Sequence, residues 1–174
     1  MNEIQLLNIL SNTFPALENV RDYTVAVDQS GNATIATWLV SGTAEPTVDA
    51  LNAELAALLL SQAQAAQIAV LQAAYNASGY APVSYMGASF PSDPNTLLLL
   101  SCTLVQGNTP QGLPSGFAWF SSTGAGVAMT LAELQGLGNA IFAQVYAAYV
   151  KLQGLIRQVE TATSIASVQA VVWS

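Results

Sequence analysis

The chain has 174 residues, of which three are Lys or Arg, ten are Asp or Glu and none is His, so its net charge is −7 at pH 7. Three cations cannot neutralise a run of phosphates, which argues against electrostatic binding to nucleic acid. The absence of histidine removes the commonest acid–base side chain and the His–Cys ligand sets of metal sites. Only 7% of the residues are charged and 52% are hydrophobic, whereas roughly 25% charged is usual for a soluble domain.

The charge deficit is concentrated in the middle of the chain, because no charged residue lies between Glu54 and Asp93 or between Asp93 and Glu133. A membrane span, disorder, or a surface covered by partners would each fit this composition. The apolar run at 55–60 is soon interrupted by glutamines, whereas a spanning helix needs about 20 predominantly apolar residues. Periodic aliphatic residues argue against disorder. We therefore expect a covered, self-associating surface and no membrane insertion.

Residues 1–45 are predicted to form an N-terminal segment with a β-hairpin. Residues 4–10 suit a short amphipathic helix or an apolar docking segment. From Tyr23 to Val40, β-branched and aromatic residues flank a turn-rich pentapeptide at 28–32, where Gly31 and Asn32 can supply positive φ. Because an isolated hairpin is barely stable, this one must pack on another element.

Residues 46–78 predict a long helix rich in Ala and Gln, capped by Thr47 or Glu45 and ended by Ser78-Gly79. Apolar and small residues recur along it at alternating spacings of three and four, as in a coiled coil. Two interpretations stay open: the helix lies on its own domain, or copies of it associate in a bundle, with a trimer favoured. The candidate self-association residues are Leu51, Leu55, Leu58, Gln62, Ala65 and Ala69.

Residues 79–174 are predicted to form a compact α+β domain. A short strand is expected at 83–86, and Asp93-Pro94 is typical of a helix start, so we expect a helix from there to about Gly107. Strands at 117–120 and 127–129 should flank a turn. A capping box from Thr130 to Glu133 opens a long helix to about Thr161, and a short helix follows at 164–172. The predicted fold class is therefore α+β, with a small antiparallel sheet packed against the long C-terminal helix.

No set of residues predicts a catalytic, cofactor or metal site, and we expect no enzymatic activity. Asp22 and Asp28 could serve as a carboxylate pair for glycoside hydrolysis, but they flank a strand and enter a turn, where Asp is structurally favoured. Cys102 lies in an apolar run and is expected to be a buried, inert thiol. Trp119 is a candidate surface aromatic, although its place in an alternating strand favours the core.

The order of motifs in the C-terminal half resembles a bacteriophage domain found in tail-fibre and tail-fibre-assembly proteins. Residues 86–96 (MGASFPSDPNT) are similar to the opening of that domain, 117–134 to its Trp-containing strand, turn and V-x-M-T-x-x-E-L segment, and 162–171 to its ending. The hairpin residues 23–38 and the helix start at 46–51 are similarly ordered in phage tail proteins.

This resemblance implies a structural component of a phage tail, in the tail fibre or baseplate, that self-associates and contributes to host attachment. Its partners would be copies of itself, other tail proteins, and a host-surface glycan or protein. It would reside in the virion after synthesis in the host cytoplasm. The alternative is a tail-fibre assembly chaperone that the virion does not retain.

Overall fold

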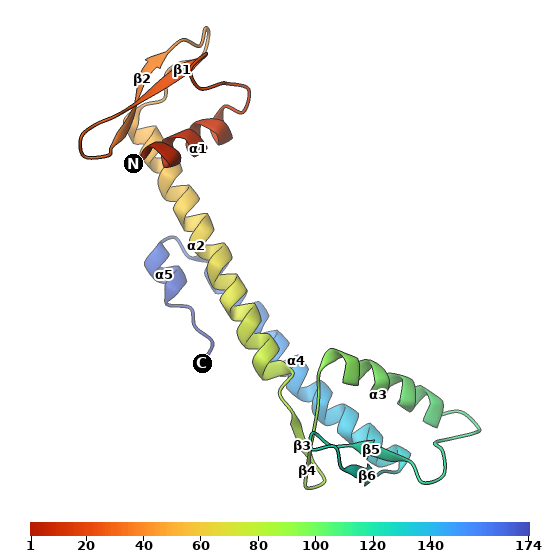
Figure 1. Cartoon of the computed structure of the whole chain (residues 1–174). Helices are drawn as coiled ribbons and strands as arrows, with labels where there is room; N and C mark the ends of the chain where they lie inside the picture. Colours follow the sequence, from red (N-terminus) through yellow and green to blue (C-terminus); the bar gives the residue numbers. More distant parts are fainter. The chain divides into compact units, whose positions relative to one another are not determined.

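The computed structural model describes residues 1–174 and has the expected α+β architecture (Figure 1). The chain divides into two compact units. Unit 1 comprises residues 1–65 and 163–165, and unit 2 comprises residues 66–162 and 166–174. The boundary at 65/66 falls inside the long second helix.

Unit 1 begins with helix α1 (Glu3–Thr13), followed by an antiparallel hairpin of strands β1 (Tyr23–Val27) and β2 (Ala33–Trp38). The helix starts at a capping box, in which the Asn2 side chain accepts a hydrogen bond from the Gln5 amide and the Gln5 side chain accepts one from the Asn2 amide, both at 2.9 Å. These bonds satisfy amide groups that no carbonyl inside the helix can reach. Of the two forms expected for this segment, the structure has the helix.

The hairpin turn is organised by Asp28. Its carboxylate accepts hydrogen bonds from the amides of Ser30 and Asn32, each at 2.8 Å. Gly31 adopts the left-handed conformation, with φ of 82°. The expectation that Asn32 shares this conformation is wrong, because the bonds to Asp28 hold Asn32 at the end of the turn instead.

The core of unit 1 forms where α1 and the hairpin meet the start of the second helix. The Trp38 ring contacts Phe14 edge-on, with centroids 5.4 Å apart, and stacks on Tyr23 at 6.1 Å. The hairpin thereby gains the apolar contact that an isolated hairpin lacks. The buried members of this core are Leu6, Ile9, Leu10, Tyr23, Ala33 and Leu51.

Helix α2 (Val48–Gly79) is a single continuous helix that contributes to both units. The Thr47 hydroxyl accepts a hydrogen bond from the Ala50 amide at 3.2 Å, so Thr47 rather than Glu45 provides the cap. The first turns of α2 complete the core of unit 1 and its last turns belong to unit 2. This two-part organisation differs from the predicted segments 1–45, 46–78 and 79–174.

Unit 2 contains two short antiparallel hairpins packed with helices, where the sequence predicted one small sheet. The hairpin β3–β4 was predicted only in part, because a Met-Gly turn gives a weak sequence signal. Met86 and Gly87 both have positive φ, 49° and 76°. The elements are β3 (Val83–Tyr85), β4 (Ala88–Phe90), α3 (Pro94–Gly107), β5 (Ala118–Phe120), β6 (Gly126–Ala128), α4 (Leu131–Thr161) and then α5 (Ile165–Gln169).

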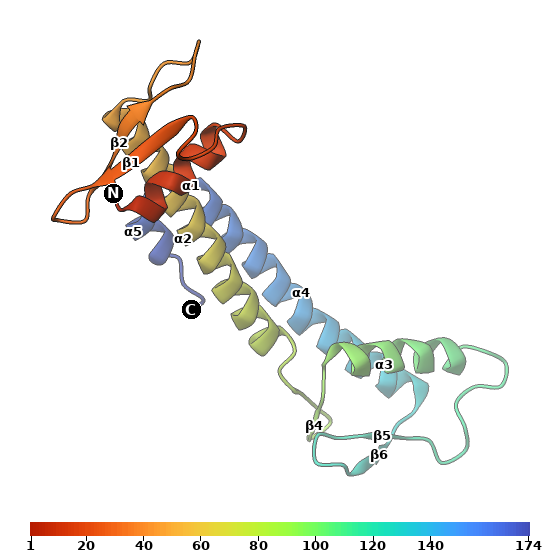
Figure 2. The ribbon, with the colours of Figure 1, turned by 45° about the horizontal axis from the view of Figure 1, so that its top comes forward.

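Helix α3 packs along the first half of α4, and the two hairpins lie beside the same half (Figure 2). Alternate residues of the short strands and one face of α4 enter a common core. Burial of this apolar surface stabilises the unit by roughly 25 cal/mol per Å². The buried core residues are Val83, Phe90, Leu100, Trp119, Met129, Leu134, Leu137 and Ile141.

Two glutamines connect parts of unit 2 that are far apart in the sequence. The Gln144 side chain on α4 donates to the carbonyls of Gly79, at 3.1 Å, and Ala81, at 2.6 Å. The Gln67 side chain on α2 donates to the carbonyl of Val171 at 2.6 Å. Glutamine amides on the helices therefore supply polar contacts to backbone carbonyls far away in the sequence.

Candidate functional site

The structure divides the six predicted self-association residues of α2 among different surroundings. Leu51 is buried in the core of unit 1 and Leu55 packs against it. Leu58 is half-buried. Gln62, Ala65 and Ala69 are exposed. At its start the helix therefore lies on its own domain, as one interpretation held, while self-association through the remaining positions stays a prediction.

A neighbouring face of α2 carries a second set of residues at alternating spacings of four and three. All of them are exposed except the half-buried Ala63. The spacing is that of a coiled-coil seam, and the set contains no charge. The sequence alone could not select between the two sets, because both have the same period. The set consists of Asn52, Ala56, Leu59, Ala63, Ala66, Val70, Ala73 and Ala77.

The prediction that Trp119 is a surface aromatic is wrong. Its side chain is only 7% exposed, because this position of β5 points into the core of unit 2, where Phe117 lies 6.4 Å away between ring centroids. The next residue, Phe120, points outward and is 65% exposed. It borders a recess of about 370 Å³ together with Leu99 of α3. The exposed aromatic of this strand is therefore Phe120.

Cys102 is also placed differently from its prediction. It is a free cysteine on the exposed side of α3. The apolar run around it belongs to a helix, and only one face of a helix is buried against its neighbour. The neighbours Leu98 and Leu99 are exposed for the same reason. A hydrophobic run therefore identified the helix but not its buried face.

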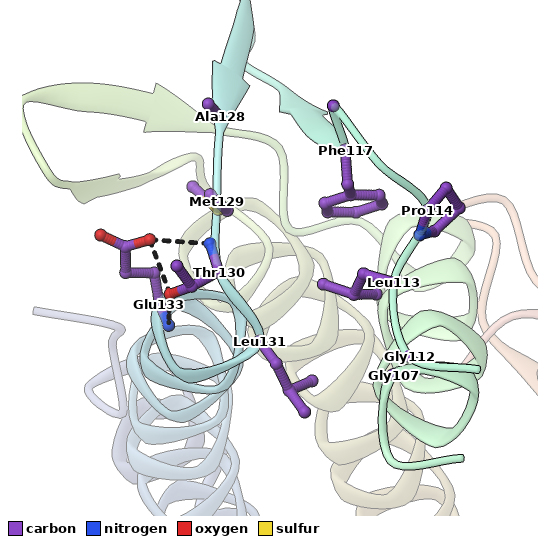
Figure 3. Close-up of a pocket in the computed structure, with 11 residues that line it drawn as sticks. Gly107, Gly112, Leu113, Pro114, Phe117, Ala128, Met129, Thr130, Leu131 and Glu133 are labelled. Atoms are coloured by element: carbon purple, nitrogen blue, oxygen red, sulfur yellow. Dashed lines mark hydrogen bonds between the residues drawn. The ribbon is translucent and has the colours of Figure 1, made fainter. Parts of the chain in front are cut away.

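One recess of unit 2 lies between the end of α3, the loop after it and the start of α4 (Figure 3). Its volume is about 570 Å³, and Leu113, Phe117 and Leu131 project toward it. The polar group at its edge is the Thr130–Glu133 capping box. There the Glu133 carboxylate accepts hydrogen bonds from the Thr130 amide at 2.7 Å and from its hydroxyl at 2.8 Å.

These hydrogen bonds, above all the one from the Thr130 amide, lower the pKa of Glu133. A carboxylate held in its charged form by a helix cap is a poor proton donor near neutral pH. The recess can accommodate an apolar group against Leu113 and Phe117, and its residues do not form a constellation of nucleophile and base.

Asp22 and Asp28, the two carboxylates considered for catalysis, form hydrogen bonds that stabilise the local backbone or a neighbouring side chain. Asp22 accepts hydrogen bonds from the Arg21 guanidinium, and these lower its pKa. Asp28 organises the hairpin turn, and the amide of Asn32 is the largest cause of its lowered pKa. No group of three or more Cys, Asp or Glu side chains is placed to hold a metal ion.

Helix α4 has an exposed aromatic face that the sequence analysis did not single out. Phe142 is 65% exposed, Tyr146 is 55% exposed and Tyr149 is 47% exposed. Phe142 and Tyr146 stack on each other with ring centroids 5.6 Å apart. The signal was present in the sequence as spacings of four and three, but the stronger aliphatic stripe of the same helix, which forms the core, obscured it.

Comparisons with known families match the chain in two parts. The family described as "Domain of unknown function (DUF4376)" matches residues 62–172, more than half of the chain. The family described as "XkdW protein", which is phage-related, matches residues 6–66. No curated protein and no solved structure matches the chain.

The two matched ranges meet within α2, where the structure also divides the chain between residues 65 and 66. The N-terminal match is to a phage-related family, which agrees with the phage resemblance expected from the order of motifs. The association with tail fibres stays a prediction.

Proposed function

The chain belongs to the DUF4376 family, with an N-terminal match to the phage-related XkdW protein, and from this premise we propose that it is a structural component of a phage tail. Its place would be the tail fibre or the baseplate, and its location the virion. The order of motifs that resembles tail proteins supports the choice of the tail among phage structures.

The observation that carries this proposal is the uncharged helical surface. The outer faces of α2 and of the first half of α4 present Ala, Val, Leu, Phe and Tyr to solvent, and no charged residue lies between Glu54 and Asp93 or between Glu133 and Lys151. A free monomer normally carries a more charged surface. Copies of the chain, or neighbouring tail proteins, would cover these faces.

The function is mechanical and adhesive. Apolar surface buried between copies stabilises their association by roughly 25 cal/mol per Å². Polar Gln and Asn side chains at the edges of the helical faces would set the register between copies. We favour a trimer, and host attachment would be to a glycan or protein of the host surface.

We also propose that the chain is not an enzyme, needs no cofactor, binds no nucleic acid and does not insert into a membrane. Helix α2 is long and apolar enough to cross a membrane by length and composition, but a single helix of this kind is weak evidence. Its glutamines at 62, 64, 67 and 72 would have to be satisfied in lipid.

Mass spectrometry of purified particles of the encoding phage tests the proposal. We expect the chain in particles at a fixed ratio to a known tail protein, also after a high-salt wash. Its absence from washed particles, with abundance in the lysate of infected cells, would contradict a virion role.

That second outcome is the one expected of a tail-fibre assembly chaperone, the alternative function. The exposed aromatic face of α4 favours this candidate too, because a chaperone presents an apolar patch while it is free. Deleting the gene separates the two roles: loss of a chaperone leaves misfolded fibres, whereas loss of a tail component leaves particles that lack one protein.

A further inference from the structure

The aromatic face of α4 lies beside a groove on the same side of unit 2. The groove has a volume of about 280 Å³ and lies between α3 and α4. It is lined by Leu97 and Leu104 of α3 and by Gly138, Asn139 and Phe142 of α4. A Cβ at Gly138 would lie 3.4 Å from the Leu104 side chain and 3.7 Å from that of Leu100, so the glycine lies directly against α3.

This surface carries both an exposed aromatic ring, Phe142, and a largely apolar recess, the groove between α3 and α4. The Phe142 ring stacks on Tyr146 and is 65% exposed. On the α3 side the groove is lined by leucines and Ser101, and on the α4 side it carries the uncharged amides of Gln135 and Asn139. A recess of this volume is large enough for one aromatic ring.

We propose that this surface is an interface between copies of the chain, in which Phe142 of one copy enters the α3–α4 groove of the next. The inference rests on the self-association proposed above and names the surface that performs it. Since each copy offers both the ring and the groove, the contact can be reciprocal in a pair or cyclic in a trimer.

Charge favours a second copy as the occupant. A chain with net charge −7 can bind itself only where its acidic residues stay out of the contact, and α4 has no charge between Glu133 and Lys151. A charged partner would find no complementary group on this face. At these exposed fractions each of the three aromatic side chains of α4 still has on the order of 100 Å² of surface that an interface can bury. Together they supply a sizeable part of the roughly 800 Å² that each partner of a stable interface buries.

The test compares two interface variants with a matched control by sedimentation equilibrium of the purified full chain over a range of concentrations. Phe142→Gln removes the ring, and Asn139→Arg obstructs the groove. Phe120→Gln is the control, because Phe120 has the same exposed fraction and lies on β5 of the same unit. Circular dichroism checks that each variant keeps the helical content of the parent.

We expect Phe142→Gln and Asn139→Arg each to raise the dissociation constant about tenfold or more, and Phe120→Gln to leave it unchanged. If the parent chain associates and both interface variants match the control, this surface is not the interface, although the chain still self-associates. A parent chain of 18.1 kDa at every concentration would overturn the self-association itself. Detection of the chain in washed particles is independent of both results.

Discussion

At the scale of single residues, hydroxyl and carboxyl groups fix where the helices of unit 2 begin. The Asp93 side chain accepts hydrogen bonds from the amides of Asn95, at 3.0 Å, and Thr96, at 3.1 Å. Glu133 and Thr130 exchange bonds at the start of α4. Both caps were predicted from the sequence because they depend only on neighbours within three residues.

These caps predict how stability depends on pH. The pKa of Asp93 is lowered chiefly by the Thr96 hydroxyl, and that of Glu133 by the Thr130 amide. A lowered folded-state pKa contributes stability that is present above the ordinary values of 3.8 and 4.5 and is lost as the pH falls through the folded-state values. We expect the midpoint temperature of thermal unfolding to decrease as the pH is lowered below about 4.5. In the double variant Asp93→Asn, Glu133→Gln these two positions no longer titrate, so the decrease should be smaller.

The two aromatic residues at the end of β5 predict very different costs of truncation. Trp119 is in the core and Phe120 faces solvent. Trp119→Ala should lower the free energy of unfolding by about 3–5 kcal/mol, because it leaves a cavity. Phe120→Ala should change it by less than about 1 kcal/mol. Urea unfolding followed by circular dichroism measures both, and equal costs would contradict the assignment of the two faces.

The turn between β3 and β4 contains a residue whose type does not suit its conformation. Met86 has a φ of 49°, and a side chain in this region is strained unless it is Asn, Asp or Gly. We expect Met86→Asn to raise the free energy of unfolding by about 0.5–1 kcal/mol, since Asn-Gly is the preferred pair for such a turn. Met86→Ala, which keeps the strain, should bring no gain.

At the scale of elements, the hydrophobic periodicity of the sequence predicted where the helices lie but not which face of each helix is buried. Helix α2 carries two sets of residues with the same spacing, at 51–69 and at 52–77. Only the packing of α1 and the hairpin shows that Leu51 and Leu55 are covered within the chain. The same limit explains Cys102, which lies in an apolar helix but on its exposed side.

The contact of Gln144 with the end of α2 predicts a structural role for an uncharged side chain. Gln144→Leu removes the donor to the carbonyls of Gly79 and Ala81. Because partly buried carbonyls lose their partner, unfolding should become easier by about 1–3 kcal/mol. Gln153→Leu, a matched change about two and a half turns further along α4, should have a smaller effect in the same thermal unfolding experiment.

At the scale of the whole molecule, the boundary between the units and the junction of the two family matches both fall within α2. A helix is a suitable junction because its backbone hydrogen bonds are satisfied within the segment, so each half can serve a different core. The sequence showed no break there, since Gly and Pro are absent from α2 until its end.

Because α2 is continuous, the face formed by the 52–77 set runs along the helix and is available for association. Val70 is the largest exposed residue of this set in unit 2. If copies meet along that face, Val70→Glu should lower the average mass in light scattering, because like charges would then be buried together. Gln72→Glu adds the same charge away from the 52–77 set and should leave the mass unchanged. An equal loss in both variants would point to net charge rather than to this face.

The sequence by itself determined the α+β class, the order of helices and the first hairpin, the two helix caps in unit 2 and the resemblance to phage proteins. These features depend on local hydrogen bonds, on turn residues and on an ordered set of motifs. Only the tertiary structure decided that Trp119 is buried and Phe120 exposed, that Leu51 belongs to the core of unit 1, and that Phe142 stands beside a groove. The reason is physical: a period states which residues share a face, but the neighbouring element decides which face is covered.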